Sequence, residues 1–277
     1  MNDLVNDAAK GQISAEAAAL YERFFVPALF DQWPGQLLEL AGVGVGDRVL
    51  DVACGTGVLA RAATARVGPT GSVTGLDLNE AMLAVAAGEE PHVTWVPAPA
   101  ESLPMSDASF DKVLCQFGLM FFADRKTALR EMARVTRPGG RVCVATWAAL
   151  SETPGYAALS ELLADLLGRE PAEALAAPFS IGTESELRTE MCAAFDQVEV
   201  RRLEGRARFA SIDDWVATDV RAWTLRELIG DQQFEELRVA ARVRLHEFCD
   251  AEGRVSFDAP ALVALASPAG VAGQQGS

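Results

Sequence analysis

The chain has 277 residues, of which 50% are hydrophobic and 23% are charged. These proportions are typical of a globular protein with a sizeable core, and they exclude the fibrous and disordered classes. Lys and Arg total 24 against 39 Asp and Glu, which gives a formal net charge of -15. A field of this sign repels phosphate backbones and anionic lipid, so neither nucleic acid nor a membrane is an expected partner.

Cysteine usage and the N-terminal residues indicate a cytoplasmic protein. The 5 cysteines are scattered, without CxxC or zinc-like spacing, and are expected to be reduced thiols. Residues 1–11 lack the basic start and apolar stretch of a signal peptide, and no apolar run reaches the roughly 18 residues of a membrane helix. Because no HxH, HExxH or clustered acidic motif is present, no metal site is expected.

Residues 15–40 form the first expected element, a helical stretch interrupted near Pro27 and Pro34. From about residue 43 to residue 147, short β-branched runs then alternate with helical patterns. This alternation predicts an α/β fold with a mostly parallel sheet and helices on both faces. The expected strands of this core are 48–53, 72–77, 92–96, 110–116 and 141–146, the last following the breaker Pro138-Gly-Gly140.

The pattern changes after the core. Residues 150–178 are interpreted as one helical excursion, 198–209 as strand material, 211–250 as two amphipathic helices and 255–265 as a closing strand. The chain is thus interpreted as one α/β domain with helical insertions. Its expected parts are an N-terminal helical lid (1–40), a cofactor-binding core (41–148), a helical insertion (149–194), C-terminal strands completing the sheet (195–210 and 254–266), a helical cap insertion (211–253) and a flexible tail (267–277).

A glycine-rich turn follows the first expected strand. The run Val49-Leu-Asp-Val-Ala-Cys-Gly-Thr-Gly57 leads from a strand into a helix. Such a turn directs backbone N–H groups and a helix N-terminus at a ligand, at the carboxyl ends of a parallel sheet. Asp77 lies 20 residues beyond Gly57, at the end of the second strand, where a carboxylate accepts hydrogen bonds from ribose hydroxyls. The pattern predicts an adenosine-containing cofactor.

Asp51 helps to decide which cofactor this is. The spacing Gly55-x-Gly57-x-x-Ala60 also fits dinucleotide-binding proteins. However, a carboxylate at Asp51 would meet a pyrophosphate with like charge, at a cost on the order of 4 kcal/mol for a pair 4 Å apart. The ammonium and sulfonium groups of S-adenosylmethionine reverse that sign, so the residues favour S-adenosylmethionine over NAD.

Four motifs in order resemble those of class I S-adenosylmethionine-dependent methyltransferases, close to the ubiquinone/menaquinone-biosynthesis type. They are Leu50-Asp-Val-Ala-Cys-Gly-Thr-Gly57, Gly75-Leu-Asp-Leu-Asn-Glu-Ala-Met82, Ala100-Glu-Ser-Leu-Pro104 with Ser109-Phe-Asp-Lys-Val113, and Arg134-Val-Thr-Arg-Pro-Gly-Gly140. The resemblance covers about residues 42–147. It implies a Rossmann-like seven-stranded sheet whose last strand runs antiparallel.

The resemblance also implies a set of cofactor-binding residues, with two departures from the usual pattern. Ala53 replaces the first glycine of the loop, and Pro99 stands where many relatives carry an Asp that contacts the adenine amino group. The implied set is Asp51, Ala53, Cys54, Gly55 and Gly57 at the methionine part, Asp77 at the ribose, Leu78 and Met82 beside the adenine, Ala100 and Glu101 at its edge, and Gln116 and Phe117 closing the pocket.

The expected activity is transfer of a methyl group from S-adenosylmethionine to O, N or C of a small hydrophobic or aromatic metabolite. Candidate residues for binding this acceptor are Tyr21, Phe25, Phe121 and Trp223, although each could instead serve only in packing. His246, one of 2 histidines, is a candidate general base. Two alternatives stay open: an NAD-dependent oxidoreductase, or a protein that keeps the cofactor fold without methyl transfer, as a sensor, partner subunit or catalyst of another rearrangement.

Overall fold

The computed structural model describes residues 14–221 and 225–268. Within these ranges, seven strands form one sheet in the order β3-β2-β1-β4-β5-β9-β6. All neighbouring strands are parallel except β9, which runs antiparallel to both β5 and β6. This confirms the expected Rossmann-like fold. The strands are β1 Arg48–Val52, β2 Ser72–Asp77, β3 Thr94–Pro97, β4 Phe110–Gln116, β5 Thr136–Trp147, β6 Val198–Leu203 and β9 Ala261–Ala266.

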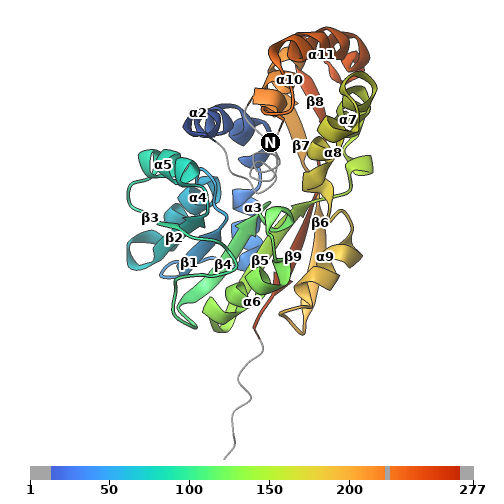
Figure 1. Ribbon diagram of the computed structural model, residues 1–277. Coiled ribbons are helices and arrows are strands. Elements are labelled where there is room, and N and C mark those ends of the chain that lie inside the picture. The colour runs from blue at the N-terminus through green and yellow to red at the C-terminus, as the bar shows by residue number, and fades with distance from the viewer. Residues whose placement is uncertain (1–13, 222–224, 269–277) are drawn as a thin grey trace, which may run out of the picture.

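Helices pack on the sheet and connect its strands (Figure 1). Helices α3 and α4 contact each other, α4 contacts β1 and β2, and α6 and α9 contact each other beside β5, β6 and β9. The helices of the N-terminal part and core are α2 Ala15–Leu20, the π-helix η1 Tyr21–Phe30, α3 Pro34–Ala41, α4 Val58–Val67, η2 Gly68–Thr70, α5 Glu80–Glu89, η3 Leu119–Phe121 and α6 Arg125–Val135. The later ones are η4 Leu150–Glu152, α7 Pro154–Leu167, α8 Arg169–Ala176, η5 Ala177–Phe179, α9 Glu184–Met191, α10 Ile212–Arg221, α11 Asp231–Arg244 and η6 His246–Phe248.

The central strands are buried because both faces of the sheet are covered. In β1, Val49, Leu50 and Val52 are all completely buried, as the continuous apolar run of a covered parallel strand requires. Two helices that follow strands begin at side-chain caps. Asn79 accepts hydrogen bonds at the start of α5, and Asp124 accepts one from the Thr127 amide at the start of α6. These caps fix where each helix leaves the sheet.

The N-terminal helical stretch continues through Pro27, contrary to the expected interruption there. The ring lies inside η1, where the chain widens to π-helical bonding, and the amide of Asp31 donates to the carbonyl of Val26 at 3.0 Å. A wider turn accommodates the missing N–H of proline without ending the helix. The break instead falls before Pro34, the first residue of α3.

Strand β5 is longer than expected because Pro138-Gly-Gly140 does not end it. Thr136 pairs with Phe110 on β4, and the register then shifts before Lys112 pairs with Arg141. A bulge of this kind tolerates proline and glycine within a strand. A side chain at Gly140 would lie 2.8 Å from the carbonyl oxygen of Asp111, so glycine permits the close approach of the two strands.

The C-terminal strands also differ from the expectation that residues 195–210 and 254–266 all complete the main sheet. Only β6 and β9 join the main sheet, whereas β7 Arg206–Phe209 and β8 Val255–Asp258 form a separate two-stranded antiparallel sheet. The excursion at 150–178 is helical, but divides into α7 and α8. The two amphipathic helices expected within 211–250 are present as α10 and α11. Together with α7 and α8, these elements form a cap above the sheet (Figure 1).

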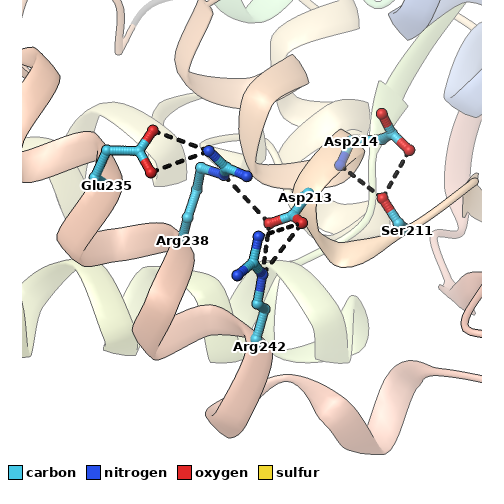
Figure 2. A network of polar contacts seen from close by, with 6 residues as sticks. All are labelled: Ser211, Asp213, Asp214, Glu235, Arg238 and Arg242. Carbon is cyan, nitrogen blue, oxygen red and sulfur yellow. Dashed lines mark hydrogen bonds and ion pairs between the residues drawn. The ribbon is translucent and has the colours of Figure 1, made fainter.

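An ion-pair network fastens the two cap helices together (Figure 2). Asp213 on α10 accepts hydrogen bonds from Arg242 at 2.7 Å and from Arg238 at 3.2 Å, both on α11. Arg238 also pairs with Glu235 one turn earlier on its own helix. A network with a bidentate arginine orders helices more effectively than an isolated surface pair.

Asp111 joins three central strands through a second network. Its carboxylate accepts hydrogen bonds from the backbone N–H of Arg48 at 2.7 Å, from the Arg48 side chain at 3.1 Å, and from the Arg137 guanidinium. Burial alone would raise the pKa of Asp111, but these bonds outweigh it and lower the pKa to about 2. The carboxylate therefore stabilises the folded chain.

We expect Asp111→Asn to lower the free energy of unfolding at pH 7 by about 1 to 2 kcal/mol, because the arginines are partly exposed and screened. Because the folded pKa of about 2 lies below the ordinary 3.8, this stabilisation is present above pH 4 and is lost as pH falls toward 2. Urea unfolding of both proteins at several pH values tests this. A difference that does not shrink at low pH contradicts it, and the exposed Asp107→Asn serves as control.

Candidate functional site

A cavity of about 340 Å³ lies at the carboxyl ends of β1, β2 and β4. In a parallel sheet this edge is the usual place for ligands, because the loops leaving adjacent strands diverge there. The strand ends bring Asp51, Asp77 and Gln116 to its wall, and η1 contributes Tyr21 and Phe30. We refer to this space as the first cavity.

Asp51 is the most unusual group in the first cavity. Its side chain is 1% exposed, and neither carboxylate oxygen has a hydrogen-bond partner among the described residues. Its pKa is raised to about 8, mainly by burial, with the backbone N–H of Ala60 lowering it and the charge of Asp77 raising it. A buried carboxyl without partners destabilises a fold, so this arrangement indicates a site built for a cationic or hydrogen-bond-donating ligand.

Two further buried polar atoms on the same wall lack partners among the described residues. They are the hydroxyl of Thr56, between the two loop glycines, and the side-chain carbonyl of Gln116 at the end of β4. The Gln116 amide donates to the carbonyl of Phe30 at 3.5 Å, which turns its oxygen away from that backbone. The sequence reasoning missed Thr56, although its place in the glycine loop was the available signal.

Asp77 holds the glycine loop in place. One carboxylate oxygen accepts from the backbone N–H of Gly55 and the other from that of Asn79, each at 2.8 Å. Burial raises the pKa of Asp77, and the amides of Asn79, Gly55 and Leu78 lower it. The residue therefore joins the loop after β1 to the start of α5, in addition to facing the cavity.

The two loop glycines serve different purposes. Gly55 has a φ of +55°, a left-handed conformation that favours glycine, although a side chain there would meet nothing within 4 Å. Gly57 does not line the cavity, contrary to the expectation that its backbone would hold the ligand. It has a φ of +86°, and a Cβ there would lie 2.5 Å from the ring of Trp95. Gly57 thus permits the turn into α4 and the packing of Trp95.

Ala53 and Phe117 both adopt a φ of +57° at the ends of adjacent strands. Such backbone strain in residues other than glycine is concentrated at functional sites. The side chain of Ala53, which replaces the usual glycine, is accommodated because its neighbour is Gly118. A Cβ added at Gly118 would lie 2.6 Å from the Ala53 Cβ.

We expect Gly118→Ala to lower the free energy of unfolding by about 1 to 3 kcal/mol, because two methyl groups would compete for one space. Gly88→Ala is the matched control, since Gly88 lies in α5 with nothing near its missing side chain. That substitution is expected to stabilise the protein by about 0.5 to 1 kcal/mol. Thermal unfolding distinguishes the two, and equal shifts for both variants contradict the steric explanation.

A second cavity, of about 80 Å³, lies between the first cavity and the cap. The two cavities share four aromatic residues, Tyr21, Phe30, Phe117 and Phe121. Tyr21 and Phe30 stack at 5.3 Å, and Phe117 stacks on Trp147 at 3.8 Å. We call the four shared residues, Tyr21, Phe30, Phe117 and Phe121, the aromatic wall.

The N-terminal helices are tied to both the core and the cap. Arg61 on α4 binds Glu22 at 2.7 Å and the carbonyl of Thr56 at 2.6 Å. The side-chain amide of Gln32 exchanges two hydrogen bonds with the backbone of Arg206 on β7, at 2.9 and 3.0 Å. These bonds hold η1 and the residues after it in place beside the first cavity, whose wall includes Tyr21 and Phe30.

The structure brings together most residues that the sequence indicated. Of the cofactor-binding set, the ones that line the first cavity are Asp51, Ala53, Cys54, Gly55, Asp77, Leu78, Met82, Ala100, Glu101, Gln116 and Phe117. Among the candidates for acceptor binding, Tyr21 and Phe121 belong to the aromatic wall and Phe25 lines the second cavity. Trp223 lies outside the described residues.

His246 is not brought to either cavity. It lies exposed on the short helix η6, where the chain leaves α11. On the preceding helix α11, the outward face that carries Val239 and Val243 is 62% and 77% exposed at these residues. That face meets solvent because Phe234, Leu237 and Ala241 form the buried stripe of the helix. The candidate general base His246 is therefore not among the residues that line either cavity.

Comparison with known proteins agrees with this geometry. Residues 50–144 match a family model described as a methyltransferase domain. A ubiquinone/menaquinone biosynthesis C-methyltransferase of Pseudomonas fluorescens is 45% identical over 118 residues, which are 40% of this chain and 46% of that protein. Its Pseudomonas aeruginosa counterpart is 38% identical over 176 residues, covering 60% of this chain and 62% of the relative. The matches thus span about half of the length of the first relative and less than two thirds of the second.

Solved structures share the fold at lower identity. The YcgJ protein of Bacillus subtilis has a TM-score of 0.55 at 23% identity, covering 86% of this chain and 98% of its own. A Haemonchus contortus phosphoethanolamine N-methyltransferase 2, solved with S-adenosyl-L-methionine, has a TM-score of 0.58 at 18% identity, covering 92% and 57%. Residues 50–144 of this chain are thus similar to a methyltransferase domain, and the chain shares the fold of these solved structures. More particularly, its sequence is similar to the quinone-biosynthesis C-methyltransferases.

Two kinds of feature are absent from the described residues. No helix in the described ranges has the length and apolar character needed to cross a membrane. Likewise, no group of three or more metal-ligating side chains occurs in the part of the chain that the structure describes.

Proposed function

We propose that this chain is an S-adenosylmethionine-dependent methyltransferase that acts on a small apolar or aromatic molecule. The observation that carries the proposal is Asp51, a buried carboxyl without partners among the described residues, facing a cavity at the end of β1. A ligand with an ammonium group would provide the missing charge and hydrogen bonds, whereas a pyrophosphate would add a second negative charge.

The other residues of the first cavity suit the remainder of that cofactor. Asp77 has acceptor capacity for ribose hydroxyls beyond its two backbone bonds. Leu78, Met82 and Ala100 offer apolar surface to the adenine. When bound, S-adenosylmethionine supplies a methyl group activated by a sulfonium.

In this proposal the protein contributes mainly position and exclusion of water. The positive charge on sulfur disappears during methyl transfer, so little new charge needs stabilising. The aromatic wall and η1 keep water from the reacting atoms, and the second cavity beyond the wall receives the acceptor. The apolar side chains there favour an aromatic or hydrophobic acceptor, as does the similarity to quinone-biosynthesis enzymes.

The net charge of -15 supports a small-molecule acceptor over nucleic acid. The same proposal places the enzyme in the cytoplasm, supported by free thiols at all five cysteines.

Calorimetry with S-adenosylhomocysteine and with NADH tests the cofactor assignment. We expect micromolar binding of S-adenosylhomocysteine and none of NADH; the reverse result contradicts the proposal and restores the oxidoreductase alternative. Mass spectrometry of acceptor extracts incubated with enzyme and cofactor then tests methyl transfer. A cofactor-binding protein that adds 14 mass units to no extract component would instead be a non-methylating member of the fold.

A further inference from the structure

The second cavity has a polar end that the sequence did not reveal. Asp219 on α10, Tyr156 on α7 and Thr153 just before α7 all line it. Asp219 is 4% exposed and Thr153 is completely buried. One carboxylate oxygen of Asp219 and the hydroxyl of Thr153 have no hydrogen-bond partner among the described residues.

Thr153 is unusual because it occupies the N-cap position of α7, yet its side chain forms no capping hydrogen bond. It is the residue before the first turn of α7, where a threonine hydroxyl ordinarily accepts a hydrogen bond from the helix backbone. Its side chain makes no such bond. The hydroxyl therefore remains available on the cavity wall.

No cationic side chain among the described residues forms an ion pair with Asp219. Burial raises its pKa well above the ordinary value, and the neighbouring Tyr156 hydroxyl and Trp215 indole N–H lower it only in part. The arginines of the cap are engaged elsewhere, with Arg238 and Arg242 both on Asp213 (Figure 2). Two unpartnered polar groups on one apolar cavity are costly to bury unless a ligand meets them.

We propose that Asp219 and Thr153, with Tyr156, form the binding site for a hydrogen-bond-donating group of the methyl acceptor, such as a hydroxyl on an aromatic ring. This inference rests on the proposed function, because only that function makes the bound molecule a methyl acceptor. Asp219 and Thr153 provide the oxygens that accept hydrogen bonds. The side chains of Phe25, Leu175 and Phe179 line the cavity around the apolar part of the bound molecule.

The size of the cavity indicates how such a molecule lies. At about 80 Å³ it is smaller than the roughly 150 Å³ that encloses a benzene ring in a protein core. An aromatic acceptor bound at Asp219 therefore extends into the aromatic wall, and Tyr21 and Phe121 must yield to it. Its far end then faces the first cavity, so Asp219 determines which part of the acceptor is presented for reaction.

The test compares p-cresol with toluene, which differ only in the hydroxyl group. Dissociation constants are measured by ligand-observed NMR with and without saturating S-adenosylhomocysteine. Wild-type protein is expected to bind p-cresol at least about tenfold more tightly than toluene, because a site built for a donor rejects an analogue that lacks it. Asp219→Leu is expected to reduce this preference to about twofold or less, and Thr153→Val to reduce it by about threefold.

Asp214→Asn is the matched control, since Asp214 is an exposed carboxylate on the same helix that contacts Ser211 (Figure 2). It is expected to leave the preference unchanged. Thermal unfolding and the affinity for S-adenosylhomocysteine show whether each variant is folded, and Asp219→Ala replaces Asp219→Leu if the latter is not. The inference is overturned if wild-type protein binds neither probe or binds both equally. It is also overturned if a variant at residue 219 keeps the wild-type preference for p-cresol over toluene. Failure to bind S-adenosylhomocysteine, with the p-cresol preference intact, overturns the proposed function alone.

Discussion

Asp51→Asn is expected to weaken the binding of S-adenosylmethionine by about 1.5 to 3 kcal/mol, or roughly 10- to 100-fold, because it removes the charge that faces the ammonium group. The variant should fold normally. With a pKa of about 8, the carboxyl is mostly protonated at pH 7 before the ligand binds, and an amide has a similar shape. Titration calorimetry measures the affinity, and the exposed Asp107→Asn provides a control.

Wild-type binding should also release a proton, since a cation beside Asp51 lowers its pKa. At pH 7 we expect a release approaching one proton, which disappears above pH 9 and is absent from Asp51→Asn. Calorimetry in two buffers of different ionisation enthalpy detects it. The same raised pKa means that the empty protein loses stability from Asp51 as pH rises from 3.8 through about 8. If Asp51→Asn and wild type bind S-adenosylmethionine with equal affinity, a group other than Asp51 holds the ammonium end of the ligand.

Asp77→Ala should reduce S-adenosylhomocysteine affinity by about 1 to 3 kcal/mol and also lower the free energy of unfolding by a similar amount. The second effect arises because the carboxylate holds the amides of Gly55 and Asn79. Affinity is measured by calorimetry and stability by urea unfolding.

Asn79→Ala distinguishes the two roles of Asp77. It removes the cap of α5 at a cost of about 1 kcal/mol but leaves the Asp77 carboxylate in place. If both variants lose stability and ligand affinity in the same proportion, Asp77 acts only by ordering the loop and does not bind the ribose.

The core strands and the glycine loop were predictable because their information is local. Each strand is a short β-branched run next to a turn signal, and Asp51 and Asp77 lie at fixed distances from the glycines. Motif order then placed most of the cofactor-binding set on one cavity. The exception was Gly57, whose contact with Trp95 joins residues from different βα units.

The second cavity was much less predictable. Asp219 and Thr153 belong to different insertions, and no spacing in the sequence indicates that they meet. The separate β7–β8 sheet was missed for a related reason, since alternation predicts a strand without naming its partner. His246 was chosen because histidines are scarce, which is information about composition and not about position.

The place of β9 in the sheet has a consequence for biosynthesis. This strand is the last element of the described chain, yet it lies between β5 and β6, and all of its residues are buried. While a ribosome is still making the C-terminal residues, β5 and β6 each present an unpaired edge, separated by the width of one absent strand. Such edges invite pairing with other nascent chains. Pairing of β9 with both β5 and β6 therefore removes these two exposed edges.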